Sequence, residues 1–161
     1  MRCLNPADKK SRLIYKAGRD IPSLYRIKWG DLILLKYENL TLDEERALYA
    51  VQDAEIIGCT FSGPADGESA LKECRNIQVK GCTFQLRYPF WHVRHAVVEH
   101  CTMTETCRAA LWYDNNITLT HCTLGGIKAL RECKDIVLDS CAINSTEFGW
   151  FCDHLHKGHI K

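Results

Sequence analysis

The chain has 161 residues, the size of one ordinary domain, and its 46% hydrophobic and 25% charged residues are typical of a globular protein. This composition excludes a wholly disordered chain, a collagen-like chain and a multi-span membrane protein. The formal net charge of +1 creates no strong overall field, so we expect neither nucleic acid nor a membrane as a partner.

The charge is divided unevenly along the chain. Residues 1–38 contain nine Lys and Arg against four Asp and Glu, a net charge of +5, whereas residues 39–161 have a net charge of −4. We predict that residues 1–38 form a basic, poorly structured extension in which LILLKY (32–37) is one short strand that begins the first repeat. The first residues contain no apolar stretch typical of a secretory signal, which favours a cytoplasmic protein with reduced thiols.

From residue 54 onwards the chain repeats one pattern of apolar residues and cysteine. Two apolar positions lie two residues apart, and a cysteine follows three residues later. These cysteines are Cys59, Cys82, Cys101, Cys122 and Cys141, with spacings of 23, 19, 21 and 19 residues. Such spacings suit a leucine-rich repeat or one coil of a parallel β-helix. The steps of two residues are typical of strands, and the leucine-rich signature is missing.

The sequence therefore predicts an all-β fold, a parallel β-helix (solenoid) over residues 39–161. We expect about six coils of 19–23 residues with three short strands each, the last coil being incomplete. The cysteine column is expected inside the coils, because buried Cys packs as a small apolar side chain and stacked side chains suit disulfide geometry poorly. Cys3 and Cys107 lie outside the columns. Asp114 occupies an apolar column, so it is either buried with a hydrogen bond or neutralised, or else lies on an outward bulge.

Several sequence blocks resemble a known family. They are DEERALYAV (43–51), GPADGESALKECRNI (63–77), LRYPFWHV (86–93), TETCRAALWY (104–113), GIKALREC (126–133) and EFGW (147–150). In order and spacing they resemble the uncharacterised bacterial domain-of-unknown-function family three-seven-three-seven. The resemblance covers roughly residues 40–156 and implies a right-handed, pectin-lyase-like β-helix, with no established activity. Because family members begin near the first block and continue for several coils, it also implies a truncated member with an added extension.

One predicted outward column is rich in aromatic and cationic residues, and we name it the aromatic stripe. Its members are Tyr49, Lys72, Trp91, Trp112, Arg131 and Trp150. The preceding column is small (Ala47, Ala70, Pro89, Ala110, Ala129), which predicts a shallow groove beside the stripe. Aromatic rings stack on sugars and bases, and cations stack on aromatic rings. The alternative is that the rings only stabilise the ladder or lie under another segment.

The column after the stripe offers candidate catalytic groups. Glu73 and His92 lie one coil, about 5 Å, apart and form a candidate acid–base pair. The loop SGPADGES (62–69) is expected to bring Asp66 and Glu68 beside the stripe as further candidate catalytic carboxylates. Arg87, Arg108 and Lys128 occupy comparable connections in later coils. This mixed rim suits an acidic sugar, or else it consists of ordinary charges on solvated turns.

Two functional hypotheses follow from these residues. In the first, the protein binds or processes a carbohydrate, with an acidic sugar among the candidates. The expected ligand-binding residues are Lys72, Arg87, Trp91, Arg108, Trp112, Tyr113, Arg131 and Trp150. In the second, it is a non-catalytic scaffold whose same face packs on a partner or a second copy of the chain. No phosphate loop, nucleophile elbow or metal-ligand cluster is evident, so we predict no cofactor and no metal. We regard His154, His156 and His159 as accidentally spaced.

Overall fold

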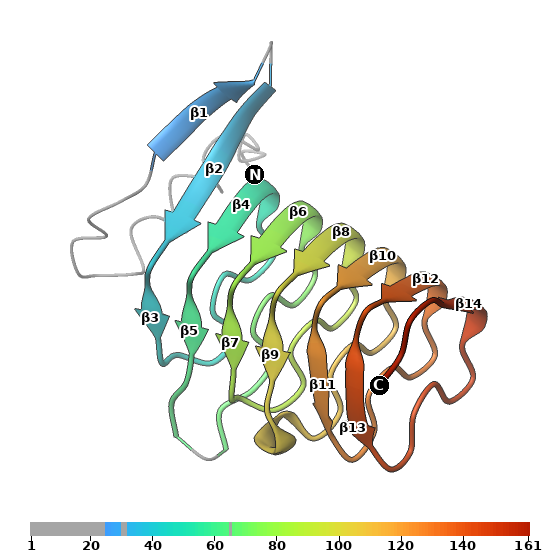
Figure 1. The fold of residues 1–161 in the computed structure, drawn as a ribbon. Helices are drawn as coiled ribbons and strands as arrows, with labels where there is room; N and C mark the ends of the chain where they lie inside the picture. The colour runs from blue at the N-terminus through green and yellow to red at the C-terminus, as the bar shows by residue number, and fades with distance from the viewer. Residues whose placement is uncertain (1–24, 30–31, 65) are drawn as a thin grey trace, which may run out of the picture.

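The computed structural model describes residues 25–29, 32–64 and 66–161, and two sheets account for nearly all regular structure in these residues (Figure 1). Sheet A has the strand order β1-β2-β4-β6-β8-β10-β12-β14, and sheet B has the order β13-β11-β9-β7-β5-β3. The strands of sheet A are β1 (Tyr25–Trp29), β2 (Leu32–Glu38), β4 (Gln52–Ile57), β6 (Arg75–Lys80), β8 (Arg94–Glu99), β10 (Asn115–Thr120), β12 (Lys134–Asp139) and β14 (Asp153–Lys157). Those of sheet B are β3 (Thr41–Leu42), β5 (Thr60–Phe61), β7 (Thr83–Phe84), β9 (Thr102–Met103), β11 (Thr123–Gly126) and β13 (Ala142–Ser145). The helical turn η1 spans Glu105–Cys107.

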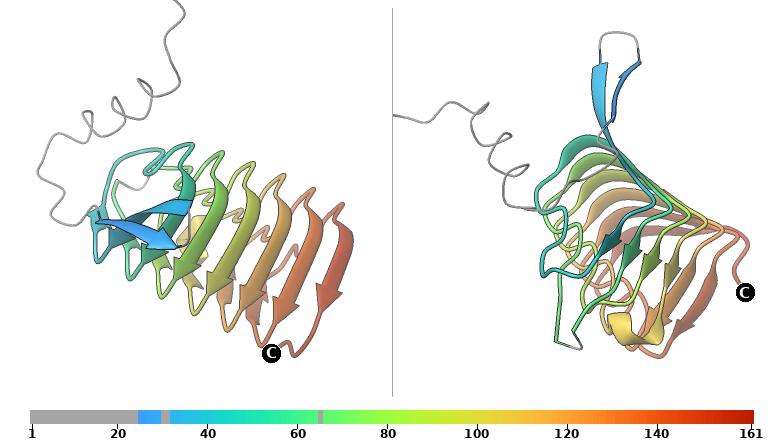
Figure 2. Two further views of the ribbon diagram at one scale, coloured as in Figure 1. Left: turned by 90° about the horizontal axis from the view of Figure 1, so that it is seen from above. Right: turned by 90° about the vertical axis from the view of Figure 1, so that its left-hand side faces the viewer.

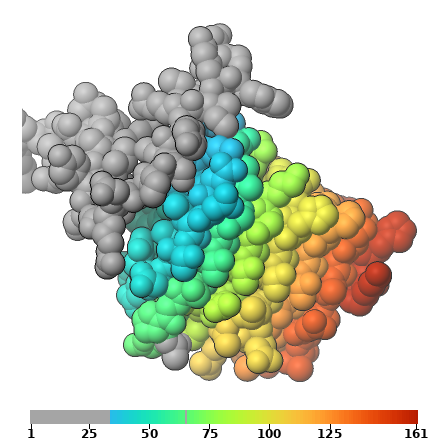
Figure 3. Space-filling view, turned by 60° about the vertical axis from the view of Figure 1, so that its left-hand side comes forward, coloured from blue at the N-terminus to red at the C-terminus, as the bar shows by residue number. Residues whose placement is uncertain are grey.

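Successive coils stack in register. Each strand of sheet B follows a strand of sheet A along the chain, and neighbours within a sheet come from consecutive coils. Ile77 pairs with Ala96, and Ala96 pairs with Ile117, so the apolar positions of the sequence repeat form continuous buried columns. The coils form parallel bands across the molecular surface (Figure 3). The predicted parallel β-solenoid of about six turns is therefore confirmed.

A hairpin precedes the first coil. β1 and β2 are antiparallel, and β2 then pairs in parallel with β4 through residues 35–38. The strand expected at residues 32–37 is β2, and β1 before it is an additional strand that the sequence analysis did not predict. The hairpin projects beyond the coils (Figure 2). Residues 1–24, which carry most of the basic extension and Cys3, lie outside the described residues. Within the described part of the chain, no helix has the length and apolar character needed to cross a membrane.

The third side of each coil is not a regular strand. The stripe positions form single-residue bridges from Trp91 to Trp112, Arg131 and Trp150 in turn. Alternate residues have positive φ values, as at Phe90 (58°) and His92 (59°), and so does Leu111 (62°) in the next coil. An L-residue in this conformation costs roughly 1–2 kcal/mol. Burial of a Leu or Phe side chain contributes roughly 1.5–3 kcal/mol, so the buried side chains hold this backbone in place.

This backbone removes the shallow groove that the sequence predicted. A regular strand sends neighbouring side chains to opposite faces, but alternating signs of φ break that rule. The small residues beside the stripe are consequently buried: Ala70, Ala110 and Ala129 are 0% exposed, and Pro89 is buried too. They fill the core and form no surface groove.

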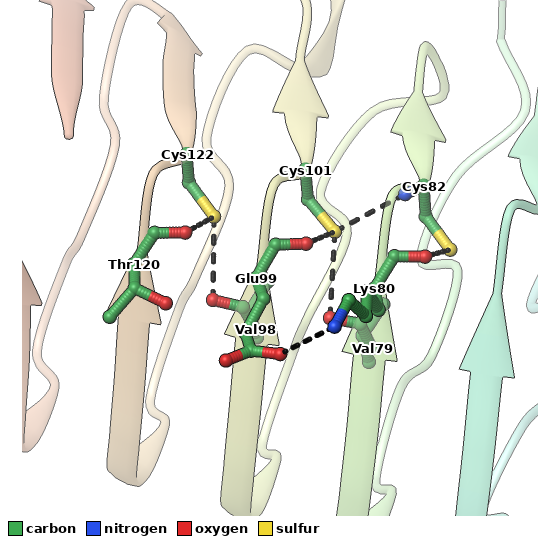
Figure 4. A network of polar contacts seen from close by, with 8 residues as sticks. All are labelled: Val79, Lys80, Cys82, Val98, Glu99, Cys101, Thr120 and Cys122. Atoms are coloured by element: carbon green, nitrogen blue, oxygen red, sulfur yellow. Dashed lines mark hydrogen bonds and ion pairs between the residues drawn. The ribbon is translucent and has the colours of Figure 1, made fainter. Parts of the chain in front are cut away.

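The cysteine column lies in the core at the corner between the two sheets, as predicted, and the described cysteines form no disulfide. Each thiol also has a polar role (Figure 4). The backbone N–H of Cys82 donates to Sγ of Cys101 at 3.3 Å, and the Cys101 thiol donates to the carbonyl of Glu99 at 3.3 Å. The thiol therefore satisfies a corner N–H that neither sheet can pair, which Ala or Val could not do.

Asp114 lies inside the coil with a hydrogen bond, which decides between the two alternatives. It is 1% exposed, and its Oδ1 accepts the backbone N–H of Val93 at 2.7 Å. Its Oδ2 is buried without a partner among the described residues. Burial raises the pKa of Asp114 well above its ordinary value, which favours the neutral acid.

Candidate functional site

The aromatic stripe forms a closely stacked ladder along the third side. The rings of Trp91 and Trp112 are stacked, with centroids 5.3 Å apart and an interplanar angle of 12°. Lys72 Nζ lies 4.6 Å from the centroid of Trp91, and the Arg131 guanidinium lies 4.9 Å from that of Trp112. Both faces of each indole are therefore covered by neighbouring coils, and neither ring offers a free face for stacking on a sugar.

The indole N–H groups also point away from solvent. Nε1 of Trp91 and Nε1 of Trp112 are buried and have no hydrogen-bond partner among the described residues. Tyr88 packs against both rings, with centroid distances of 6.0 Å to Trp91 and 6.2 Å to Trp112. The edges that these two half-buried rings present to solvent are consequently hydrocarbon.

The far end of the stripe is more open. Trp150 is 45% exposed and Phe151 is 79% exposed, and their rings meet edge to face. Lys128 Nζ lies 5.7 Å from the centroid of Trp150 and forms an ion pair with Glu147 at 3.4 Å. This end presents the largest aromatic surface of the described stripe.

A hollow lies between the stripe and the start of sheet A, and we name it the corner groove. It is an open surface hollow with a volume of about 410 Å³. The residues lining it are Ala50, Gln52, Glu73, Arg75, His92 and Arg94. Between them runs the buried column of Val51, Cys74 and Val93. Since each buried corner residue has an outward residue on either side, the two outward columns form walls on either side of this inward-facing column.

The wall nearest the stripe carries the predicted acid–base pair. Glu73 and His92 both line the groove, so the structure brings these two together. The Tyr49 hydroxyl donates to Glu73 Oε2 at 2.7 Å, and this hydrogen bond raises the pKa of Tyr49. In the next coil Tyr113 stacks on His92, with ring centroids 5.0 Å apart. Tyr113 thereby limits the movement of the His92 ring.

The opposite wall carries two arginines that the sequence analysis did not single out. Arg75 and Arg94 begin β6 and β8 and pair in register, with Gln52 before them and Asn115 after them in the same column. Among the described residues, no ion pair involves either arginine. The sequence does contain a signal for this wall: a polar residue directly follows each buried corner residue, as Arg75 follows Cys74 and Arg94 follows Val93.

The acidic and basic residues expected to form a rim beside the stripe do not line the corner groove. Neither Asp66 nor Glu68 is among the residues lining the corner groove. Arg87 donates from Nη2 to the carbonyl of Asp66 at 2.6 Å and pairs with Glu68 through a backbone bridge. The carbonyl of Arg108 accepts the N–H groups of residues 127 and 128. The rim residues therefore contact one another and do not join the pair Glu73 and His92.

The described residues contain no group of three or more His, Cys, Asp and Glu side chains that could hold a metal ion. Two of the C-terminal histidines have carboxylate partners instead. His154 Nδ1 lies 2.8 Å from Asp135, and His159 Nδ1 lies 3.2 Å from Asp139. These contacts link neighbouring coils.

The fold and the groove define a parallel β-solenoid with a polar hollow at one corner. The family model of DUF3737, proteins of unknown function, matches residues 35–161, and the chain belongs to this family. No curated protein matches the chain. Among solved structures, it is similar to the crystal structure of a "putative glycosyl hydrolase" from Parabacteroides merdae. The two share 8% sequence identity with a TM-score of 0.49, over 81% of this chain and 78% of that one.

Proposed function

We propose that this protein binds a carbohydrate in the corner groove. The observation that carries the proposal is a hollow of about 410 Å³ with polar side chains on both walls. Sugars present hydroxyl groups that both donate and accept hydrogen bonds. The walls supply both kinds of partner: carboxylate acceptors from Glu73, guanidinium donors, and the amide of Gln52, which does both.

The aromatic stripe lies beside this site, and none of its residues is among those lining the groove. Because the faces of Trp91 and Trp112 are covered, the rings do not act as stacking platforms; instead Trp91 stacks on His92 and supports the wall that His92 belongs to. Stacked aromatic residues with cations at either end resist rearrangement. A wall of fixed geometry lowers the entropy lost on binding.

Binding is better supported than hydrolysis. A glycosidase needs two carboxyl groups on either side of the scissile bond. Glu73 is the one carboxylate among the described residues that line the groove. The pair of Glu73 and His92 remains the candidate for proton transfer, and its role in processing a sugar stays a prediction.

An array of neutral and acidic glycans, followed by calorimetric titration of the binders, tests the proposal. We expect at least one glycan to bind, and the double variant Glu73→Ala, His92→Ala to weaken that binding at least about tenfold, as for the loss of one charge-assisted hydrogen bond. Gln78→Ala, an exposed residue of β6 outside the groove, is the matched control and should bind normally. Absence of binding to every glycan, or full binding by the double variant, contradicts the proposal.

A non-catalytic interaction surface is the second candidate. It is favoured by the exposure of Trp150, at the end of the stripe, and of its neighbour Phe151. Sedimentation velocity over a range of concentrations tests self-association through this area. A dimer that dissociates in the variant Trp150→Ala, Phe151→Ala would support this function, and a monomer at all concentrations would count against it.

A further inference from the structure

We infer that the corner groove selects carboxylated sugars, with the guanidinium groups of Arg75 and Arg94 binding the carboxylate. This inference rests on the proposed carbohydrate site and specifies its ligand class. It places the acid-binding residues on the sheet A wall, whereas the sequence analysis had expected them in the connections at Arg87, Arg108 and Lys128.

The first step is the position of the two arginines. They lie directly opposite each other on adjacent parallel strands, so their Cα atoms are about 4.8 Å apart. Both residues are exposed, and both line the groove. Two guanidinium groups at this spacing can both reach one carboxylate bound in the hollow.

The second step is that neither arginine forms an ion pair among the described residues. Like charges directly opposite each other in a sheet are destabilising. At the other end of the same two strands, Lys80 faces Glu99 and forms an ion pair at 3.5 Å. The pairing of β6 with β8 thus neutralises charge at one end and leaves two positive charges together at the groove. The flanking residues of the column, Gln52 and Asn115, are both neutral.

The third step is the chemistry of the two walls. A guanidinium group offers planar, paired donors that match the two oxygens of a carboxylate, and these charge-assisted bonds are stronger than neutral ones. On the facing wall, Glu73 repels a ligand carboxylate but accepts bonds from hydroxyl groups, and Tyr49 holds it in place. The groove therefore orients an acidic sugar, with its carboxylate toward sheet A and its hydroxyls toward the stripe.

Calorimetric titration with matched probes tests the inference. The probes are trisaccharides of galacturonate, glucuronate and mannuronate, each compared with its methyl ester, which removes the charge and keeps the sugar. We expect at least one acid to bind at least about tenfold more tightly than its ester, as for a bond to a charged group. In the variant Arg75→Gln, Arg94→Gln the preference for the acid over its ester should disappear, with acid binding reduced to the level of the ester. Lys134→Gln, in the same column but outside the groove, is the control for charge alone.

The outcomes separate the two proposals. Equal binding of acid and ester, or selectivity retained in the arginine variant, overturns the inference and leaves carbohydrate binding intact. If neither acid nor ester binds, and the array also shows no binder, the proposed function itself fails. A polyglutamate peptide that competes as well as the acidic trisaccharide would identify an acidic peptide as the ligand and would also overturn the inference. Thermal unfolding of each variant confirms that the fold is retained.

Discussion

The carboxyl group of Asp114 and the backbone N–H of Val93 lie in consecutive coils and form a hydrogen bond of 2.7 Å inside the solenoid. Cys101 makes the corresponding contact at another corner, where its Sγ accepts the N–H of Cys82. A coil that turns sharply leaves a backbone N–H without a sheet partner, and the next coil supplies a side-chain acceptor. Val93 lies between His92 and Arg94, so Asp114 supports the inward-facing column between the walls of the corner groove.

Removing this acceptor should destabilise the protein. We expect Asp114→Ala to lower the free energy of unfolding by about 1–3 kcal/mol, because the N–H of Val93 is left buried and unpaired. Asp114→Asn keeps an oxygen at the same place and should cost much less. Denaturant unfolding measures both, with the exposed residue Asp43 replaced by Ala as the control. Equal losses for the Ala and Asn variants would show that the hydrogen bond is unimportant.

The same residue should make stability depend on pH. Burial raises the folded-state pKa of Asp114 above its unfolded value near 3.8, so the neutral acid is the form that folding favours. The associated stabilisation is complete below the unfolded pKa and is lost as the pH rises through the folded-state pKa. Relative to Asp114→Asn, the natural chain should therefore become less stable as the pH rises above about 4. A difference that is constant with pH would contradict this assignment.

The inward columns and the buried cysteines could be predicted from the sequence, because strands with a period of two stack identical positions in register. The third side could not. Its buried Leu and Phe residues adopt positive φ values, which their residue types do not indicate. A column that does favour this conformation lies beside it: Asp53, Asn76, His95, Asn116, Asp135 and His154 all have φ between 52° and 57°. Asn, Asp and His are the non-glycine residues most enriched there.

The groove was only half predictable for a related reason. Glu73 and His92 were identified because they follow the aromatic stripe in the sequence. Arg75 and Arg94 were missed because only the column directly after the stripe was considered, although one inward residue separates that column from the arginines and the period of two places both on the outer surface. The sharp turn at that position turns both flanking columns outward and makes them the two walls of one site.

The two central tryptophans should be needed for folding. Trp91→Ala and Trp112→Ala each remove a half-buried ring whose faces are both in contact with neighbours. We expect each to lower the free energy of unfolding by about 3 kcal/mol, the lower end of the range for large aromatic truncations. Phe151→Ala, which removes a ring that is 79% exposed, is the control and should change stability by less than about 0.5 kcal/mol. Small losses at both tryptophans, together with lost glycan binding, would instead support a ligand platform.

Thiol labelling should distinguish one cysteine from the other described ones. Cys152 is partly exposed, whereas the remaining described cysteines are buried. Its interaction with Cys133 lowers the pKa of Cys152 below its ordinary value, and a larger thiolate fraction makes a thiol more reactive. Burial raises the pKa of Cys74 and of Cys107 to about 12, which keeps them as inert thiols.

In a Cys3→Ser background, which removes the cysteine outside the described residues, we therefore expect one thiol to react rapidly with a disulfide reagent under native conditions. The remaining thiols should react only after unfolding. Mass spectrometry of labelled peptides should locate the fast reaction at Cys152, and Cys152→Ser should abolish it. Its rate should rise with pH and reach half its maximum below pH 9, the ordinary pKa of a cysteine. Rapid labelling of several cysteines would show that the coils open readily and that the stacked thiols are not held in a closed core.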